Sequence, residues 1–113
     1  MANSFINKKV DLTTTALTTL YKVPSFKSSI IKSLLVSEDA GSGSTITVTL
    51  VDSSSNIFSL FKTKTISGNA TTELLTNPLI MEESEILKVQ AADANQLHVV
   101  ASILEIQPRE VTT

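Results

Sequence analysis

The chain has 113 residues, 42% of them hydrophobic and 18% charged, with a formal net charge of −2 and no cysteine. That length fits one domain, and the absence of cysteine excludes disulfides, zinc–thiolate sites and thiol nucleophiles. No basic stripe is present to neutralise phosphates, so direct nucleic-acid binding is not expected. No run approaches the roughly 20 apolar residues of a membrane span, and no secretory signal opens the chain, so we expect synthesis in a cytoplasm.

The N-terminal segment, residues 1–9, is largely polar and carries the hydrophobic pair Phe5 and Ile6. We expect it to be a flexible arm that could exchange with a neighbouring chain as an added strand. The expected domain follows as residues 10–107, and residues 108–113 after the last strand are expected to form a loose tail.

The first half of that domain alternates between apolar and polar residues. A strand over 16–23 ends at Pro24, because proline cannot donate to a ladder, and a longer apolar strand follows over 28–36. Residues 38–44 are rich in Gly and Ser, which predicts a hairpin loop rather than a phosphate loop. The alternating run 45–50, the turn formers 52–56 and the run 57–62 together predict a hairpin.

The second half continues with short strands over 71–75 and 79–81. Runs over 86–91 and 97–106 predict a last hairpin across Asp93-Ala94-Asn95. About eight strands and no helix result, with turn signals every 8–12 residues. This pattern predicts an all-β fold, a single antiparallel β-sandwich that is Ig-like or jelly-roll-like.

Two of these strands are apolar on both faces. In strand 97–106, Leu97, Val99, Ala101 and Ile103 alternate with a second set, and strand 28–36 has the same character. A sandwich core covers only one face of each sheet, so either a loop or terminus of the chain or another subunit must cover the second face. The residues expected at such an interface are Phe5, Ile6, Ile31, Leu35, Val100, Leu104 and Ile106.

The sequence contains little that indicates catalysis. His98 is the only histidine, it lies within a strand, and no nucleophile motif surrounds any serine. The carboxylates Glu82, Glu83 and Glu85 could form a weak cation site, but charges in one turn are more typical of a solvated loop. We therefore expect no enzyme activity, no metal and no cofactor.

Several segments together resemble a known family. Five segments carry the resemblance: the run Ala16-Leu17-Thr18-Thr19-Leu20-Tyr21-Lys22-Val23-Pro24, the strand 30–36, the hairpin start Thr45–Ser54, the segment Pro78–Ala91 and the closing Ser102-Ile103-Leu104-Glu105-Ile106. They are similar to small β-rich virion proteins of tailed bacteriophages, especially marine and cyanobacterial ones. The resemblance covers nearly the whole chain through strand and turn patterns.

The resemblance implies a structural role in the virion. The expected function is that of a capsid decoration, or cement, protein that docks on the major capsid protein or other virion proteins and stabilises the particle, with a homotrimer as the preferred oligomer. One alternative is a structural or host-adhesion module of the tail or neck. Another is a carbohydrate-binding β-sandwich, for which Phe58 and Phe61 would have to supply exposed aromatic faces.

Overall fold

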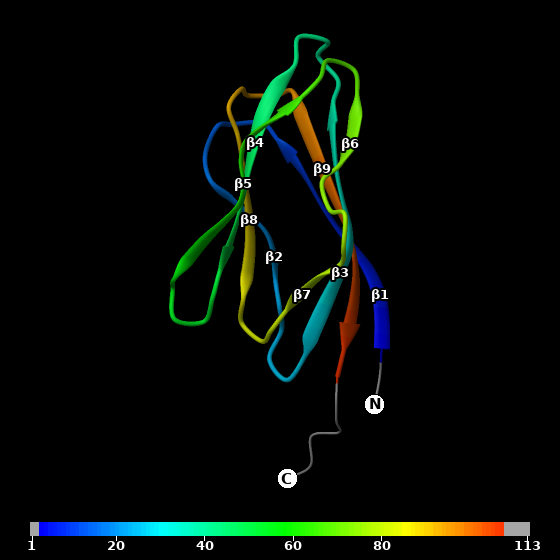
Figure 1. Ribbon diagram of the computed structural model, residues 1–113, viewed down its shortest axis with the longest axis vertical. Helices are drawn as coiled ribbons and strands as arrows, with labels where there is room; N and C mark the ends of the chain where they lie inside the picture. The colour runs from blue at the N-terminus through cyan, green and yellow to red at the C-terminus, as the bar shows by residue number, and fades with distance from the viewer. Residues whose placement is uncertain (1–2, 108–113) are drawn as a thin grey trace.

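The computed structural model describes residues 3–107, which form two antiparallel sheets and nine strands (Figure 1). In chain order the strands are β1 (Asn3–Leu12), β2 (Thr18–Lys22), β3 (Ser28–Glu38), β4 (Ser44–Val51), β5 (Ile57–Ile66), β6 (Thr71–Glu73), β7 (Leu79–Met81), β8 (Ile86–Ala91) and β9 (Leu97–Ile106). The expected all-β sandwich is confirmed. Within the described residues no helix is long and apolar enough to cross a membrane.

Sheet A has the order β1-β9-β3-β6, with β7 also paired to β3, and sheet B has the order β2-β8-β4-β5. The strands pair as if the chain were one long hairpin: β1 with β9, β2 with β8, β3 with β6 and β7, and β4 with β5. Rolling that hairpin so that β3 also meets β9 and β4 also meets β8 gives the two sheets. This connectivity is a jelly roll rather than an Ig-like sandwich.

The β4–β5 hairpin follows directly from the sequence pattern. In β4 the side chains of Ile46 and Val48 are fully buried, while the intervening threonines lie on the outer face of sheet B. At the turn, the Asp52 carboxylate accepts hydrogen bonds of 2.9 Å from the backbone N–H groups of Ser54 and Asn56. An aspartate that bonds the backbone two residues on is a local turn former, which is why this hairpin is predictable.

Two other connections differ from the expected hairpins. The strands on either side of residues 39–43, β3 and β4, lie in different sheets, and so do β8 and β9 on either side of residues 92–96. Both hairpin predictions were wrong, because alternation identifies a strand without identifying the sheet it joins. Both loops instead cross between the sheets at the same end of the sandwich (Figure 1).

The N-terminal segment is not an arm from Asn3 onward. It forms β1, which pairs with β9 in unbroken register from Asn3↔Ile106 to Leu12↔Leu97. The sandwich therefore begins at Asn3 rather than at residue 10. The first two residues and the expected tail, 108–113, lie outside the described residues. The polar composition of β1 hid the strand, because only Ile6, Val10 and Leu12 contribute apolar side chains to the inner face.

A β-bulge in β3 changes which residues face the core. The register with β9 shifts between Ile31 and Ser33, so Lys32 is an extra residue. Ile31 and Leu34 are both fully buried, three positions apart, instead of following the two-residue period. Ile31 was expected on the outer face with Leu35. The bulge places Ile31 in the core and leaves Ile30 on the outer face.

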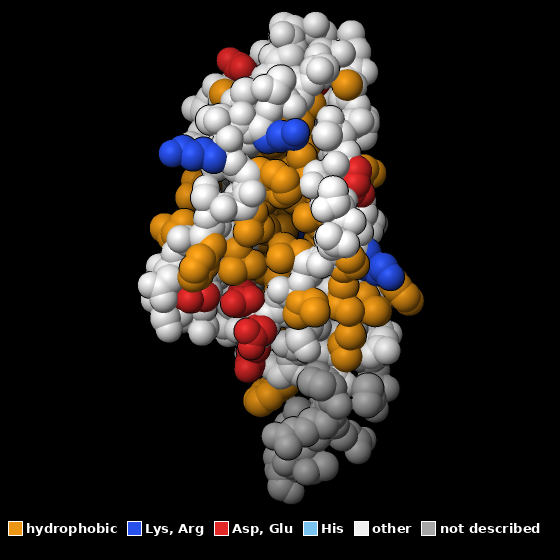
Figure 2. All heavy atoms as spheres, in the orientation of Figure 1, with side chains coloured by type: hydrophobic (Ala, Val, Ile, Leu, Met, Phe, Trp, Pro, Cys, Tyr) orange, Lys and Arg blue, Asp and Glu red, His pale blue; other side chains and the backbone are white. Residues whose placement is uncertain are grey.

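The core fills the space between the sheets, and one edge of the sandwich leaves part of it visible. Figure 2 shows hydrophobic side chains gathered between the strands of sheet B on the left and those of sheet A on the right. Half-buried apolar side chains from β5, β7 and the segment between β6 and β7 pack against the core: Leu60, Phe61, Leu75 and Leu79. At this edge the strands β5, β6 and β7 are all outermost in their sheets.

Candidate functional site

A row of four apolar side chains crosses the outer face of sheet A. The registers place Phe5 of β1 opposite Leu104 of β9, Leu104 opposite Ile30 of β3, and Ile30 opposite Ile80 of β7. Opposite side chains on one face lie about 5 Å apart, so the four form a continuous strip, called here the apolar row. Phe5 is 79% exposed and Ile80 is 68% exposed, and the two central members are half-buried.

A second pair of aliphatic side chains lies on the same face, four positions from Leu104 along β9 and beyond an intervening polar row of Asn7, Ser102 and Ser33. Leu35 of β3 is opposite Val100 of β9, and Leu35 remains 37% exposed. Ile106, at the end of β9, is half-buried on the same face. No described segment packs over this face, so the alternative that a loop of the chain covers it does not hold for residues 3–107.

The expected interface residues therefore divide into two groups. Phe5, Leu35, Val100, Leu104 and Ile106 share the outer face of sheet A. Ile6 and Ile31 face the interior instead, Ile31 because of the bulge and Ile6 because it is opposite the buried Ile103. Neither Ile30 nor Ile80 is among the residues that the sequence pattern assigned to an interface.

The bulge that places Ile30 on this face is held by Glu73 of β6. Its carboxylate accepts hydrogen bonds from the backbone N–H of Leu34 at 2.7 Å and of Leu75 at 3.2 Å, and from the Ser33 hydroxyl. Partial burial raises the pKa of Glu73, but these three donors outweigh it and hold the pKa below its ordinary value. The negative charge is therefore part of the structure at this edge of sheet A.

His98 lies on the outer face of sheet A beyond Val100. Its Nε2 is 3.2 Å from an Asp11 carboxylate oxygen, and its Nδ1 is 3.6 Å from an Asp39 carboxylate oxygen. Both ring nitrogens therefore face carboxylates, and neither faces a hydroxyl nucleophile. The imidazole joins β1 and the β3–β4 loop to β9, and the expectation that the chain is not an enzyme stays a prediction.

The glutamates of the 82–85 turn make local backbone contacts. Glu83 accepts a hydrogen bond of 2.8 Å from the backbone N–H of Phe26, and Glu85 accepts one of 2.8 Å from the backbone N–H of Glu82. Within residues 3–107, no group of three or more His, Asp or Glu side chains is placed to hold a metal ion. On β5, Phe58 is exposed and Phe61 is half-buried against the core.

Glu38 organises the end of the sandwich where the crossing loops meet. Its buried carboxylate accepts hydrogen bonds from the backbone N–H groups of Gly41 at 2.8 Å, Gly43 at 3.1 Å and Asn69 at 3.0 Å. Burial raises the pKa of Glu38, but these backbone donors outweigh that effect and hold the pKa below its ordinary value. The Glu38 carboxylate thereby holds the β3–β4 loop and the β5–β6 loop together.

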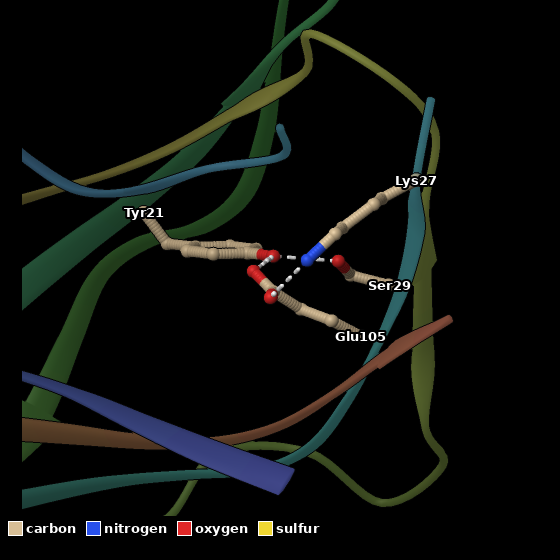
Figure 3. Close-up of polar contacts among 4 residues, drawn as sticks. All are labelled: Tyr21, Lys27, Ser29 and Glu105. Carbon is tan, nitrogen blue, oxygen red and sulfur yellow. Dashed lines mark hydrogen bonds and ion pairs between the residues drawn. The ribbon is translucent and has the colours of Figure 1, made fainter. Parts of the chain in front are cut away.

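A polar cluster joins the two sheets at the opposite end (Figure 3). The Tyr21 hydroxyl of β2 lies 2.5 Å from a Glu105 carboxylate oxygen of β9 and 2.6 Å from the Ser29 hydroxyl of β3. Lys27 Nζ lies 3.4 Å from the other oxygen of Glu105. Glu105 follows Ile103 on the inward face of β9, so its alternation could have indicated that it points into the core.

Taken together, the described residues define a jelly-roll domain with an uncovered apolar face on sheet A. Comparison with known proteins agrees with that fold: a chain in the acid-stable capsid structure of Helicobacter pylori bacteriophage KHP30 is similar at a TM-score of 0.59 and 12% identity. The similarity covers 100% of this chain and 95% of that one. At that identity the likeness establishes the shared fold.

Two further structures are more distant. The C-terminal family 22 carbohydrate-binding module of Clostridium thermocellum Xyn10B is similar at a TM-score of 0.45 and 16% identity, over 97% of this chain and 84% of that one. A chain of infectious bursal disease virus, Gt strain, is similar at a TM-score of 0.40 and 11% identity, over 93% of this chain and 30% of that one. No protein-family model and no curated protein sequence matches the chain.

Proposed function

We propose that this chain is a structural protein of a tailed-phage virion and that it acts as a capsid decoration, or cement, protein. The observation that carries the proposal is the uncovered outer face of sheet A, which carries the apolar row and, beyond the polar row of Asn7, Ser102 and Ser33, the pair Leu35 and Val100. An exposed sheet face that carries a continuous apolar row and further aliphatic side chains is typical of a protein that packs against another protein.

The chemistry around the apolar row favours burial in a protein interface. The two central strands, β9 and β3, carry only His98 and Lys32 as ionisable groups on this face, and the other polar side chains are serines. Interface centres are depleted in charged residues, because hydroxyls cost less free energy to desolvate than ions do. The partner proposed for this face is the major capsid protein.

Two further observations support a place in the virion. The chain of the phage KHP30 capsid structure has the same fold over the full length of this chain. Jelly rolls recur in viral capsid domains, which supports a place in the virion. They also occur in lectins, so the fold alone does not assign the function. The strand and turn patterns shared with small virion proteins of tailed phages point to the same class.

The proposed assembly is a homotrimer on the capsid surface. Each docked copy would stabilise the shell through apolar burial at about 25 cal/mol per Å². Linked copies also raise one another's effective concentration at the surface. A tail or neck location is the neighbouring possibility, and a density map of the intact particle separates the two by where the sandwich is found.

The docking face can be tested with capsids assembled without this protein. Co-sedimentation of the purified chain with such capsids should saturate, and Leu35→Glu should weaken binding at least about tenfold, because it buries a charge in the interface. Leu17→Glu is the matched control, since Leu17 is 49% exposed but lies in the β1–β2 loop. Absence of binding, or equal losses for both variants, would refute the proposal.

A further inference from the structure

The two ends of the apolar row lie on the two open edges of sheet A. Phe5 is on β1, whose only strand partner among the described residues is β9. Ile80 is on β7, whose only strand partner among them is β3. An unpaired edge strand leaves backbone N–H and C=O groups available to another strand. Each of these two edge strands also carries a highly exposed apolar side chain, Phe5 on β1 and Ile80 on β7.

The directions of the strands make the two edges complementary. Adjacent strands in the order β1-β9-β3-β7 are antiparallel, so β1 and β7 run in opposite directions. A copy of β1 placed beside β7 would therefore continue the antiparallel alternation of the sheet. The edge formed by β7 and β6 spans Ser29 to Ser37 of β3, which is close to the ten-residue length of β1.

The register that continues the apolar row also pairs opposite charges. In sheet A, Phe5 belongs to the row that ends at Ile80, and Lys9 belongs to the row that contains Val100 and Leu35 and ends at Glu73. A neighbouring β1 in this register would place its Phe5 beside Ile80 and its Lys9 beside Glu73. Opposite charges across a strand pair are stabilising.

The inner face fits the same register. With Phe5 beside Ile80 in an antiparallel pair, the neighbouring Ile6 would lie beside Leu79. Leu79 is one of the half-buried side chains at the open edge of the sandwich, together with Leu60, Phe61 and Leu75 of the same copy. Figure 2 shows the hydrophobic side chains at this edge. The added strand would cover part of that surface.

We infer that copies of this chain associate head to tail, with β1 of one copy added to the β7–β6 edge of the next. A head-to-tail contact closes into a ring when the rotation per copy permits, and a ring of three would be the homotrimer proposed above. The edges of sheet A then serve self-association, and its outer face stays available to the capsid. The inference concerns the isolated protein, so it can fail while capsid docking holds.

Because the chain has no cysteine, introduced cysteines report this contact directly. In Phe5→Cys/Ile80→Cys, mild oxidation should give disulfide-linked oligomers up to the trimer, since directly opposite side chains lie within reach of a disulfide. The control Asn7→Cys/Ile80→Cys, displaced by two residues or about 7 Å along β1, should cross-link several-fold less. Efficient dimers from Phe5→Cys alone would show that two β1 strands pair with each other, and would overturn the head-to-tail arrangement.

Charge reversal provides a second, independent test by sedimentation velocity. Lys9→Glu should weaken self-association roughly tenfold, because it replaces an attraction with a repulsion beside Glu73. The matched control Lys88→Glu, on the outer face of sheet B, should leave it unchanged. Circular dichroism confirms that each variant is folded. A native protein that stays monomeric at all concentrations, or equal losses for Lys9→Glu and Lys88→Glu, would overturn the inference.

Discussion

The Tyr21 hydroxyl donates a 2.5 Å hydrogen bond to the Glu105 carboxylate, and so joins β2 of sheet B to β9 of sheet A through the interior. The two residues are 84 positions apart in the chain. Removing either partner would leave the other polar group buried without its main contact. The cluster in Figure 3 therefore fixes one end of the sandwich in a single arrangement.

Tyr21 is the only tyrosine, so the phenolate absorbance of the folded protein reports this group alone. Burial raises the pKa of Tyr21, and the hydrogen bond and negative charge of Glu105 raise the pKa further. We expect ionisation well above the ordinary value of about 10. Glu105→Gln should move it to lower pH, and the exposed Glu82→Gln should not. Native titration near the ordinary value would contradict the buried contact.

Glu38 should make the protein acid-sensitive. Its pKa is lower when folded than when unfolded, so its contribution to stability is complete above the unfolded pKa of about 4.3 and is lost as the pH falls through the lower folded pKa. Glu38→Gln should reduce the melting temperature at pH 7 and flatten its decline below about pH 4.3. Hydrogen exchange should increase in residues 39–43 and 67–70. A profile that matches the control Glu82→Gln would refute this role.

The bulge at Lys32 predicts opposite behaviour for two adjacent isoleucines. Ile31 is fully buried, and Ile31→Ala should lower the free energy of unfolding by about 2–5 kcal/mol through lost burial and a cavity. Ile30 is half-buried on the outer face, and Ile30→Ala should cost clearly less. Urea unfolding of the two variants measures both values. Equal losses, or a larger loss for Ile30→Ala, would place the bulge elsewhere.

Gly68 is required by a close approach of two loop backbones. A Cβ added there would lie 2.3 Å from the carbonyl oxygen of Gly41, which is a backbone atom and cannot rotate away. Gly68→Ala should therefore destabilise the protein by about 1–3 kcal/mol, the usual cost of overpacking. The neighbouring Ser67→Ala is the control for this turn, and thermal unfolding is the measurement. A melting temperature equal to that of the control would mean that the loops separate freely.

The exposed aliphatics of the two sheets predict different solution behaviour. Ile80 and Ile57 are both 68% exposed, but Ile80 ends the apolar row of sheet A, whereas Ile57 begins β5 of sheet B. Ile80→Glu should shift the protein toward the monomer, and Ile57→Glu should not. Light scattering after gel filtration gives the masses. The same mass change in both variants would show that general hydrophobicity, rather than the row, drives association.

Much of the fold could be predicted from period-two alternation alone. Thr45 to Leu50 and Leu97 to Ile106 are strands in the structure as expected, and the Asp52 turn joins β4 to β5. Val100, Leu104 and Ile106 lie on the outer face because β9 has no bulge to shift the alternation. Local preference and side-chain period act within a few residues, so they can be read without knowing what the strand packs against.

Only the tertiary structure decided how those strands combine. It placed β3 and β4, and likewise β8 and β9, in different sheets, and it recruited the polar segment Asn3–Leu12 as an edge strand. It also decided which side chains of β3 face the core, because a bulge shifts their alternation. The Leu34 N–H at that bulge donates a hydrogen bond to the Glu73 carboxylate. These outcomes depend on partners distant in sequence, and backbone groups and carboxylates must find such partners wherever the chain buries them.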